Sequence, residues 1–127
     1  MIAHRLSILL IEDSQTYALL ATAILDGMGH SVEVATTAEE GLARARELVP
    51  TVILMDINLP GMNGYEAVRQ IRQDSVLRYV PVIAMTVTEP VNKATIEMGI
   101  EAGFTGHTQK PIHEDAFRFV LNTYLGP

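Results

Sequence analysis

Short apolar runs alternate along this chain with segments of helical pattern. The runs Ile8–Ile11, Val52–Met55 and Val82–Met85 are continuously apolar, whereas Val32–Val34 alternates with a charged residue and Phe104–Thr108 is weaker. Continuous runs of about four residues are typical of strands buried on both faces, and an alternating run is typical of an edge strand. The pattern therefore predicts a parallel sheet.

Helical spacing fills the stretches between these runs. Ser14 is the expected N-cap of the first helix, and the capping box Thr37–Glu40 is expected to open the second. Three more helices are expected over Tyr65–Gln73, from Pro90 to about Ala102, and from about His113 to Leu125. The expected apolar faces consist of Tyr17, Leu20, Ile24 and Met28; Leu42, Ala45 and Leu48; Val68 and Ile71; and Phe117, Val120, Leu121 and Tyr124.

Strand and helix alternate throughout the chain, which predicts an α/β fold. The 127 residues fit one domain, residues 1–127, with 48% hydrophobic residues to build a core. Because the weak edge strand comes second in the sequence, we expect a three-layer flavodoxin-like (βα)5 fold with the parallel sheet order 2-1-3-4-5. Ligands of such sheets bind beyond the carboxyl ends of the strands.

Composition excludes several kinds of site. The absence of cysteine excludes disulfides, thiolate metal sites and a cysteine nucleophile. The four histidines lack the spacing of metal ligands, so we assign no transition-metal site. A formal net charge of −6 argues against direct nucleic-acid binding. No apolar run approaches the ~20 residues of a membrane helix, and no signal peptide is recognisable, so we expect a cytoplasmic protein that does not bind membranes.

Residues suited to phosphoryl chemistry stand at the carboxyl ends of four predicted strands. They are Glu12 and Asp13 after the first, Asp56 after the third, Thr86 after the fourth and Lys110 after the fifth. The first and third strands are neighbours in the expected order, so three carboxylates would share one pocket. Such crowding requires a cation, and an all-oxygen ligand set indicates Mg²⁺. A carboxylate can carry an acyl phosphate, while a hydroxyl and an ammonium group stabilise the transferring oxygens.

Each residue alone also has an ordinary interpretation. Asp13 would be a solvated turn or a helix cap, and Asp56 could cap the loop that follows it. Thr86 could cap the next segment, and Lys110 would be an ordinary surface lysine. Their joint placement at four strand ends favours a shared pocket over four unrelated residues.

Four stretches carry a pattern that covers essentially the whole chain: Ile11–Ser14, Met55–Gly64, Ala84–Thr86 and Lys110–Ile112. Together they resemble the receiver domain of bacterial two-component response regulators, in its single-domain, chemotaxis-regulator-like form. The resemblance implies that Asp56 accepts a phosphoryl group from a sensor histidine kinase or a histidine phosphotransfer protein.

The resemblance also assigns the residues around Asp56. It implies that Glu12, Asp13, Asp56 and the backbone carbonyl of Asn58 hold Mg²⁺, for which Mn²⁺ can substitute. Thr86 would be the switch hydroxyl and Lys110 the cation that pairs with the phosphoryl oxygens, with a candidate cis peptide at Lys110–Pro111. Phosphorylation would then rearrange the face formed by the fourth helix, fifth strand and fifth helix, and would change the affinity for a downstream protein. Such a domain assists only its own phosphorylation and dephosphorylation and is not otherwise an enzyme.

Three positions depart from the family pattern. His107 stands at the switch position, three residues before the lysine, where Tyr or Phe is usual. A histidine there predicts pH-sensitive coupling to Thr86. The alternative is an exposed histidine with no switching role. Val87 stands where a small residue is usual and predicts slow labelling by acetyl phosphate or a long-lived acyl phosphate. Lys110 follows Thr86 by 24 positions, slightly more than usual, which leaves the start of the fourth helix open.

Three other functions compete with this interpretation. An aspartate-nucleophile phosphohydrolase needs an acid two residues after the nucleophile, where Asn58 stands. A receiver that binds partners without phosphorylation would not need the complete set of Glu12, Asp13, Asp56, Thr86 and Lys110. A flavin-binding protein would need aromatic stacking loops, which the sequence does not offer. The sequence names neither the kinase nor the downstream target.

Overall fold

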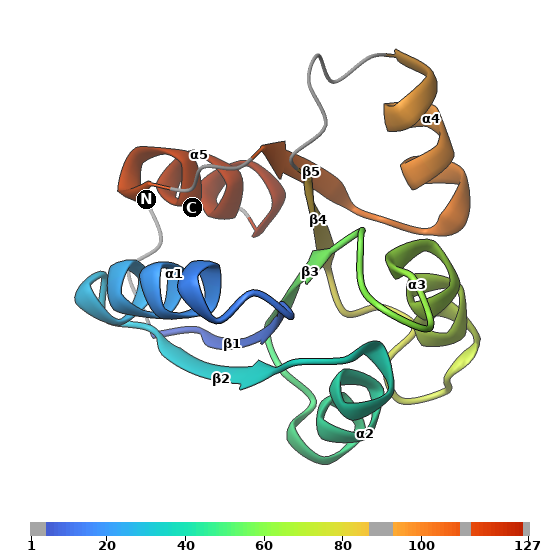
Figure 1. The fold of residues 1–127 in the computed structure, drawn as a ribbon, viewed down its shortest axis with the longest axis horizontal. Helices are drawn as coiled ribbons and strands as arrows, with labels where there is room; N and C mark the ends of the chain where they lie inside the picture. The colour runs from blue at the N-terminus through green and yellow to red at the C-terminus, as the bar shows by residue number, and fades with distance from the viewer. Residues whose placement is uncertain (1–4, 87–92, 110–112, 126–127) are drawn as a thin grey trace.

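The computed structural model describes residues 5–86, 93–109 and 113–125. Within these residues, strand and helix alternate five times, and Figure 1 shows how they are arranged. The elements are β1 (Ser7–Ile11), α1 (Gln15–Gly27), β2 (Ser31–Ala35), α2 (Ala38–Leu48), β3 (Val52–Asp56), α3 (Gly64–Gln73), β4 (Val82–Thr86), α4 (Lys93–Ala102), β5 (Gly106–Gln109) and α5 (Glu114–Leu125).

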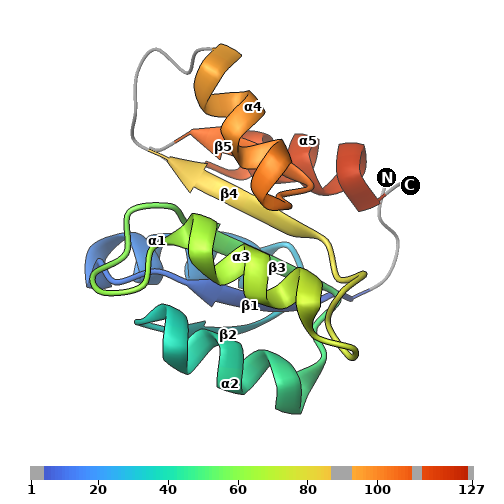
Figure 2. The same cartoon turned by 90° about the vertical axis from the view of Figure 1, so that its right-hand side faces the viewer.

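One five-stranded sheet organises the molecule. Its order is β2-β1-β3-β4-β5 and every pair of neighbours is parallel, which confirms the predicted flavodoxin-like topology. Helices α2, α3 and α4 cover one face of the sheet, and α1 and α5 cover the other (Figures 1 and 2). The alternating segment forms the edge strand β2, which stays partly exposed.

Each face of the sheet has its own hydrophobic core, and this explains why the central strands are continuously apolar. In β1, for example, Leu9 and Ile11 face α2 and α3, whereas Ile8 and Leu10 face α1 and α5. Successive side chains of a strand point to opposite faces, so a strand covered on both faces needs apolar residues at every position. Strands β3 and β4 are accordingly buried along their whole length.

The predicted helix caps are present. Ser14 Oγ accepts a hydrogen bond from the Tyr17 N–H at 3.3 Å, and Thr37 Oγ1 accepts one from the Glu40 N–H at 3.1 Å. The Glu40 carboxylate reaches back to the N–H of Thr36 at 2.9 Å, one residue before the position that a capping box predicts. The bonds to the Tyr17 and Glu40 N–H groups pair backbone donors that the first helical turn leaves without a partner.

The expected apolar face of α1 is only partly right, because Ile24 and Met28 pack against the core but Leu20 does not. Ala18, Ala21 and Leu25 are the buried residues of α1, while Leu20 is 42% exposed and Tyr17, Ile24 and Met28 are only partly buried. The two alanines let the helix backbone lie close to the sheet.

Other boundaries also differ from expectation. In α2, Leu48 is 38% exposed rather than part of the buried face. Strand β5 begins at Gly106, two residues later than expected, because Phe104 instead packs edge-on against Tyr65 with 6.1 Å between ring centroids. The expected start of the fourth helix at Pro90 lies outside the described residues.

Val49 ends α2 in a left-handed conformation with φ of 44°. A β-branched side chain is strained there, whereas glycine adopts this conformation freely. We expect Val49→Gly to raise the free energy of unfolding by about 1 kcal/mol in urea titrations. Val76→Gly is the matched control, since Val76 is also exposed but has no positive φ, and it is not expected to stabilise. If Val49→Gly had a lower free energy of unfolding than wild type, the backbone strain proposed at Val49 would be contradicted.

Candidate functional site

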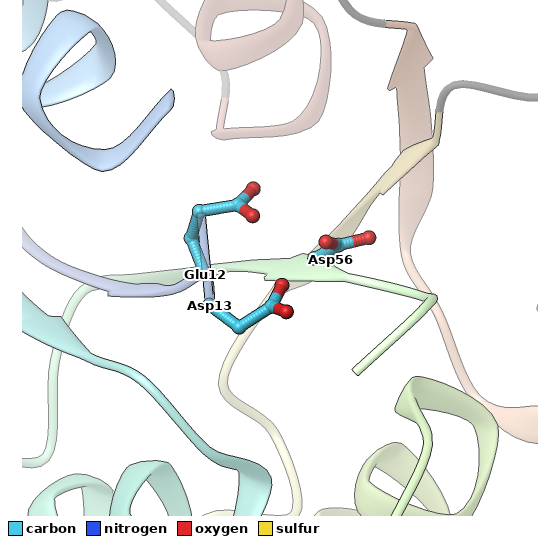
Figure 3. Close-up of side chains that lie close together, drawn as sticks. All are labelled: Glu12, Asp13 and Asp56. Carbon is cyan, nitrogen blue, oxygen red and sulfur yellow. The ribbon is translucent and has the colours of Figure 1, made fainter. Parts of the chain in front are cut away.

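Three carboxylates meet at the carboxyl edge of the sheet. Glu12 and Asp13 follow β1, and Asp56 is the last residue of β3. Because β1 and β3 pair in parallel with Ile11 opposite Met55, the residues that follow come together. One oxygen from each carboxylate lies within 4.8 Å of the others, and Figure 3 shows the three side chains directed into the same space. The clustering predicted from the strand ends is therefore present.

The three acids differ in burial. Glu12 is 1% exposed and Asp56 6% exposed, whereas Asp13 is exposed. Backbone donors orient the two buried carboxylates: the Ser14 N–H donates to Glu12 Oε1 at 3.1 Å, and the Asn58 N–H donates to Asp56 Oδ1 at 2.9 Å. Asp56 therefore caps the loop that follows β3, as the alternative interpretation of this residue predicted, and it also belongs to the acidic cluster.

The donor set fits a hard divalent cation. All three groups are carboxylates, which is the chemistry that Mg²⁺ and Ca²⁺ prefer, and the cluster contains no sulfur or imidazole ligand. Ionised carboxylates this close repel one another, so a cation among them would lower the free energy of the folded state. The exposed Asp13 leaves the cluster open to solvent on one side.

The loop after Asp56 depends on a close approach at Gly64. A Cβ on Gly64 would lie 2.8 Å from Ile57 Cα and 3.0 Å from the Asp56 carbonyl oxygen. The Gly64 N–H donates to the Ile57 carbonyl at 2.9 Å, and Asn63 caps α3 through the Glu66 N–H at 3.0 Å. Sequence analysis did not identify this contact between the start of α3 and the end of β3.

Thr86 lies on the other side of Asp56 from the two β1 acids. It is the last residue of β4, one position beyond the Met85 that pairs with Asp56, and it is 2% exposed. The strand order β1-β3-β4 therefore places Asp56 between a pair of acids and a hydroxyl. Lys110, Pro111 and Val87 lie outside the described residues, so the predicted cation, the candidate cis peptide and the crowding at Val87 stay predictions.

His107 lies on β5 opposite Ala84 of β4 and is half-buried rather than exposed. It lines a hollow beneath α4 together with Thr86 and Tyr124. Tyr124 was expected only on the apolar face of the last helix, and its place in this hollow beside Thr86 was not predicted.

Comparison with known proteins places the whole fold in one group. Residues 8–122 match the family model of the response regulator receiver domain. The chain is 35% identical to Protein PilH of Pseudomonas aeruginosa over 118 residues, which covers 93% of this chain and 96% of that protein. It is 32% identical to the polar-differentiation response regulator DivK of Brucella ovis over 120 residues, covering 94% of this chain and 96% of that protein.

Solved structures agree. The chemotaxis response regulator CheY4 of Vibrio cholerae superimposes with a TM-score of 0.87 at 26% identity, covering 95% of this chain and 99% of that one. The receiver domain of the sensor histidine kinase PA1611 of Pseudomonas aeruginosa, solved with a magnesium ion coordinated in its active site cleft, superimposes with a TM-score of 0.85 at 28% identity, covering 98% and 100% of the two chains. Across the described ranges, no helix combines the length and apolar character needed to cross a membrane.

Proposed function

The chain belongs to the response regulator receiver domain family, whose general function is phosphorylation-mediated signalling, and from this premise we propose that Asp56 is its phosphoacceptor. The observation that carries the proposal is the position of Asp56 between the acids that follow β1 and the hydroxyl at the end of β4. A carboxylate oxygen of Asp56 would attack the phosphorus of a phosphohistidine, on a sensor kinase or a phosphotransfer protein, and form an acyl phosphate while the histidine leaves.

Glu12, Asp13 and Asp56 would hold Mg²⁺, together with the backbone carbonyl of Asn58, and Mn²⁺ would substitute for it. The bound ion supplies positive charge that offsets the acids and the transferring phosphoryl oxygens. The chain's own contribution is orientation, since the Ser14 and Asn58 N–H groups fix the two buried carboxylates. The magnesium ion in the PA1611 receiver supports the assignment by analogy.

Thr86 and Lys110 would complete the site as donors to the phosphoryl oxygens. A change at Thr86 is proposed to reach the surface formed by α4, β5 and α5, where a downstream protein binds. Asn58 cannot replace the general acid of a phosphohydrolase. We therefore propose a signalling domain that assists only its own phosphorylation and dephosphorylation.

Labelling by acetyl phosphate tests the proposal. Intact-mass measurement should show the addition of one phosphoryl group in the presence of Mg²⁺, and peptide mapping should place it on Asp56. Chelation of divalent ions should reduce labelling to background. Labelling that persists after divalent ions are chelated would contradict the proposed function, and so would steady turnover of a phosphate ester.

His107 should make the switch sensitive to pH. Its half-buried ring lines the same hollow as Thr86, so this side chain can couple Thr86 to the surface formed by α4, β5 and α5. We expect the NMR shift changes of α4, β5 and α5 on labelling to differ at least about two-fold between pH 6 and 8. His107→Ala should remove that difference, and His113→Ala, which alters an exposed histidine, should preserve it. Equal responses of wild type at both pH values would refute this role.

A further inference from the structure

The loop between α3 and β4, residues 74–81, presents large side chains to solvent. Tyr79 is 86% exposed and Val76 is 55% exposed, although both residue types are usually at least partly buried. The Arg46 guanidinium of α2 pairs with the Asp74 carboxylate at 2.7 Å, so the end of α2 lies beside this loop. Figure 2 shows the α2–β3 and α3–β4 connections on the same side of the sheet, where the strands begin.

We call the exposed side chains of these two segments the α3–β4 surface. Its members are Leu48 and Val49 at the end of α2, and Val76, Arg78 and Tyr79 of the loop. Exposed apolar side chains that gather in one place indicate an interaction site. The α3–β4 surface is therefore a candidate for contact with another molecule.

Hydrogen bonds hold the loop in one conformation. Asp74 Oδ1 accepts from the N–H groups of Val76 and Leu77 at 2.8 and 3.2 Å. The Arg78 N–H donates to the Asp74 carbonyl at 2.9 Å, and the Arg78 carbonyl accepts from Arg72 Nη1 at 3.1 Å. A loop that is ordered before binding loses less conformational entropy when a partner docks. The exposed side chains are thus presented on a fixed backbone.

An arginine and a tyrosine form the centre of the α3–β4 surface. The Arg78 guanidinium lies 5.4 Å from the centroid of the Tyr79 ring, a cation–π contact that restricts both side chains. Tyrosine and arginine are among the residue types that most often dominate the binding energy of protein interfaces. This pair is therefore suited to anchor a partner.

The two segments that meet here are basic, although the chain as a whole is acidic. Residues 44–49 and 69–79 contain five of the nine Lys and Arg residues but only two of the fifteen Asp and Glu residues. The five cations are Arg44, Arg46, Arg69, Arg72 and Arg78, and the two acids are Glu47 and Asp74. A local excess of cations attracts an acidic partner.

Ion pairing leaves this excess of positive charge at the surface. The side chain of Asp74 is 15% exposed and that of Arg46 is 50% exposed, so their pair presents mainly its cation to solvent. Glu47 pairs with Arg44 at 3.2 Å. Arg78 has no carboxylate partner among the described ion pairs, so its charge is available to a bound molecule.

We propose that the α3–β4 surface binds an acidic segment of a partner protein. Tyr79 would contact an apolar side chain of that segment, and the Arg78 guanidinium would pair with one of its carboxylates. Bidentate pairing with a carboxylate suits the planar guanidinium, which can also keep its contact with the tyrosine ring.

Binding at this surface should not depend on the state of Asp56. The loop precedes β4, whereas Asp56 ends β3, so the two lie at opposite edges of the sheet. The groups that order the loop, Arg46, Arg72 and Asp74, belong to the same edge as the loop itself. The α3–β4 surface would therefore hold the domain near its partner both before and after phosphorylation.

A random 12-residue peptide library displayed on phage, selected on the whole chain, tests the proposal. Enriched peptides should carry several aspartate or glutamate residues beside an apolar residue, and fluorescence polarisation gives their affinity. Tyr79→Ser should weaken their binding at least about ten-fold. Phe119→Ser is the matched control, since Phe119 of α5 is also an exposed aromatic residue, and it should leave binding unchanged.

A charge reversal tests the electrostatic part. Arg78→Glu should weaken the same peptides at least about ten-fold, and added salt should weaken their binding to wild type. Lys93→Glu reverses an exposed cation of α4 and should preserve the affinity. All these side chains are exposed, so the far-UV spectra should match that of wild type. Basic consensus peptides, or acidic peptides that bind Tyr79→Ser and Arg78→Glu as tightly as wild type, would overturn the proposal.

Other occupants would give different results. A single-stranded oligonucleotide that binds more tightly than the selected peptides, and loses its affinity in Tyr79→Ser, would overturn the choice of a protein partner. Self-association of wild type in sedimentation experiments that Tyr79→Ser abolishes would assign the surface to a second copy of this chain instead.

Acetyl phosphate with Mg²⁺ separates this proposal from the proposed function. The affinity for the selected peptides should stay within about two-fold when Asp56 is labelled, and a ten-fold change would overturn the independence of the two edges. Peptides that bind through Tyr79 to a chain that cannot be labelled would support the docking surface and contradict the proposed function. Normal labelling without Tyr79-dependent peptides would do the reverse.

Discussion

Asp56→Asn is expected to reduce labelling by acetyl phosphate to background. An amide is not a nucleophile under these conditions, so no acyl phosphate can form at this position. The variant should keep the fold, because the Asn Oδ1 atom can still accept the hydrogen bond that Asp56 Oδ1 receives from the Asn58 N–H at 2.9 Å. Intact-mass spectrometry after incubation with acetyl phosphate and Mg²⁺ measures the effect.

The same substitution should change the response to metal. Removing one of three carboxylates whose oxygens lie within 4.8 Å relieves their repulsion, so the metal-free variant should unfold at a higher temperature than the metal-free wild type. Added Mg²⁺ should then raise the melting temperature less than it does in wild type, because a ligand that binds only the folded state stabilises it less when the ligand binds more weakly.

Asp13→Asn is the matched control, since it removes a neighbouring carboxylate but keeps the proposed nucleophile. It should weaken the effect of Mg²⁺, and labelling should recover as the Mg²⁺ concentration is raised. Labelling of Asp56→Asn at the wild-type level would assign the phosphoacceptor to another residue.

The sheet and the acidic cluster could be predicted from the sequence because both depend on local pattern. Strands covered on both faces must be apolar throughout, as β3 and β4 are, and in a parallel sheet the residues that follow each strand reach the same edge. The meeting of Glu12, Asp13 and Asp56 follows from these two facts and from the strand order.

The buried face of α1 could not be predicted in the same way. This helix carries apolar residues on several sides, and Leu19 and Leu20 are 65% and 42% exposed. Periodicity alone then selects the large residues, whereas contact with the sheet selects the small Ala18 and Ala21. The distance between helix and sheet decides this, and it is a property of the assembled fold.

The hollow beneath α4 that His107, Thr86 and Tyr124 line was missed for a related reason. It arises where side chains are small or missing, at Ala84 and Gly99, and where Tyr124 arrives from the far end of the chain to cover Gly106. Hydrophobic periodicity identifies side chains that are present. It therefore cannot identify a space that forms between elements far apart in the sequence.

Arg72→Met is expected to lower the free energy of unfolding by about 3 kcal/mol, measured by urea titration. The Arg72 guanidinium of α3 joins three parts of the chain: Nε donates to the Gly103 carbonyl at 2.8 Å, Nη1 donates to the Val80 carbonyl at 2.7 Å, and Nη2 donates to Thr105 Oγ1 at 3.3 Å. Partial burial lowers the pKa of Arg72, but the group stays charged at every pH of interest. Methionine keeps most of the apolar stem and leaves these acceptors without their donor.

The position of Arg72 also depends on a neighbouring glycine. Gly103 has φ of 126°, and a Cβ there would lie 2.8 Å from Arg72 Cγ. Thr105 in turn bonds to β4, since its N–H donates to the Val82 carbonyl at 2.7 Å and its Oγ1 accepts from the Val82 N–H at 3.1 Å. Arg72 therefore holds the beginnings of β4 and β5 in register, and the same two strands end at the paired Thr86 and Gln109.

Two further variants test whether the fork-shaped geometry of the Arg72 guanidinium or its positive charge alone stabilises the folded state. Arg72→Lys should recover only a minor part of the lost stability, because one ammonium group cannot reach acceptors on three segments at once. Arg69→Met removes an exposed arginine of the same helix and should change the free energy of unfolding by less than about 0.5 kcal/mol. Amide exchange at Thr105 and Gly106 should accelerate in Arg72→Met more than in Arg69→Met. Unfolding of Arg72→Met at the same urea concentration as wild type would contradict this role. Water would then hydrogen-bond to these carbonyls as well as Arg72 does, and the register of β4 and β5 would depend on strand pairing alone.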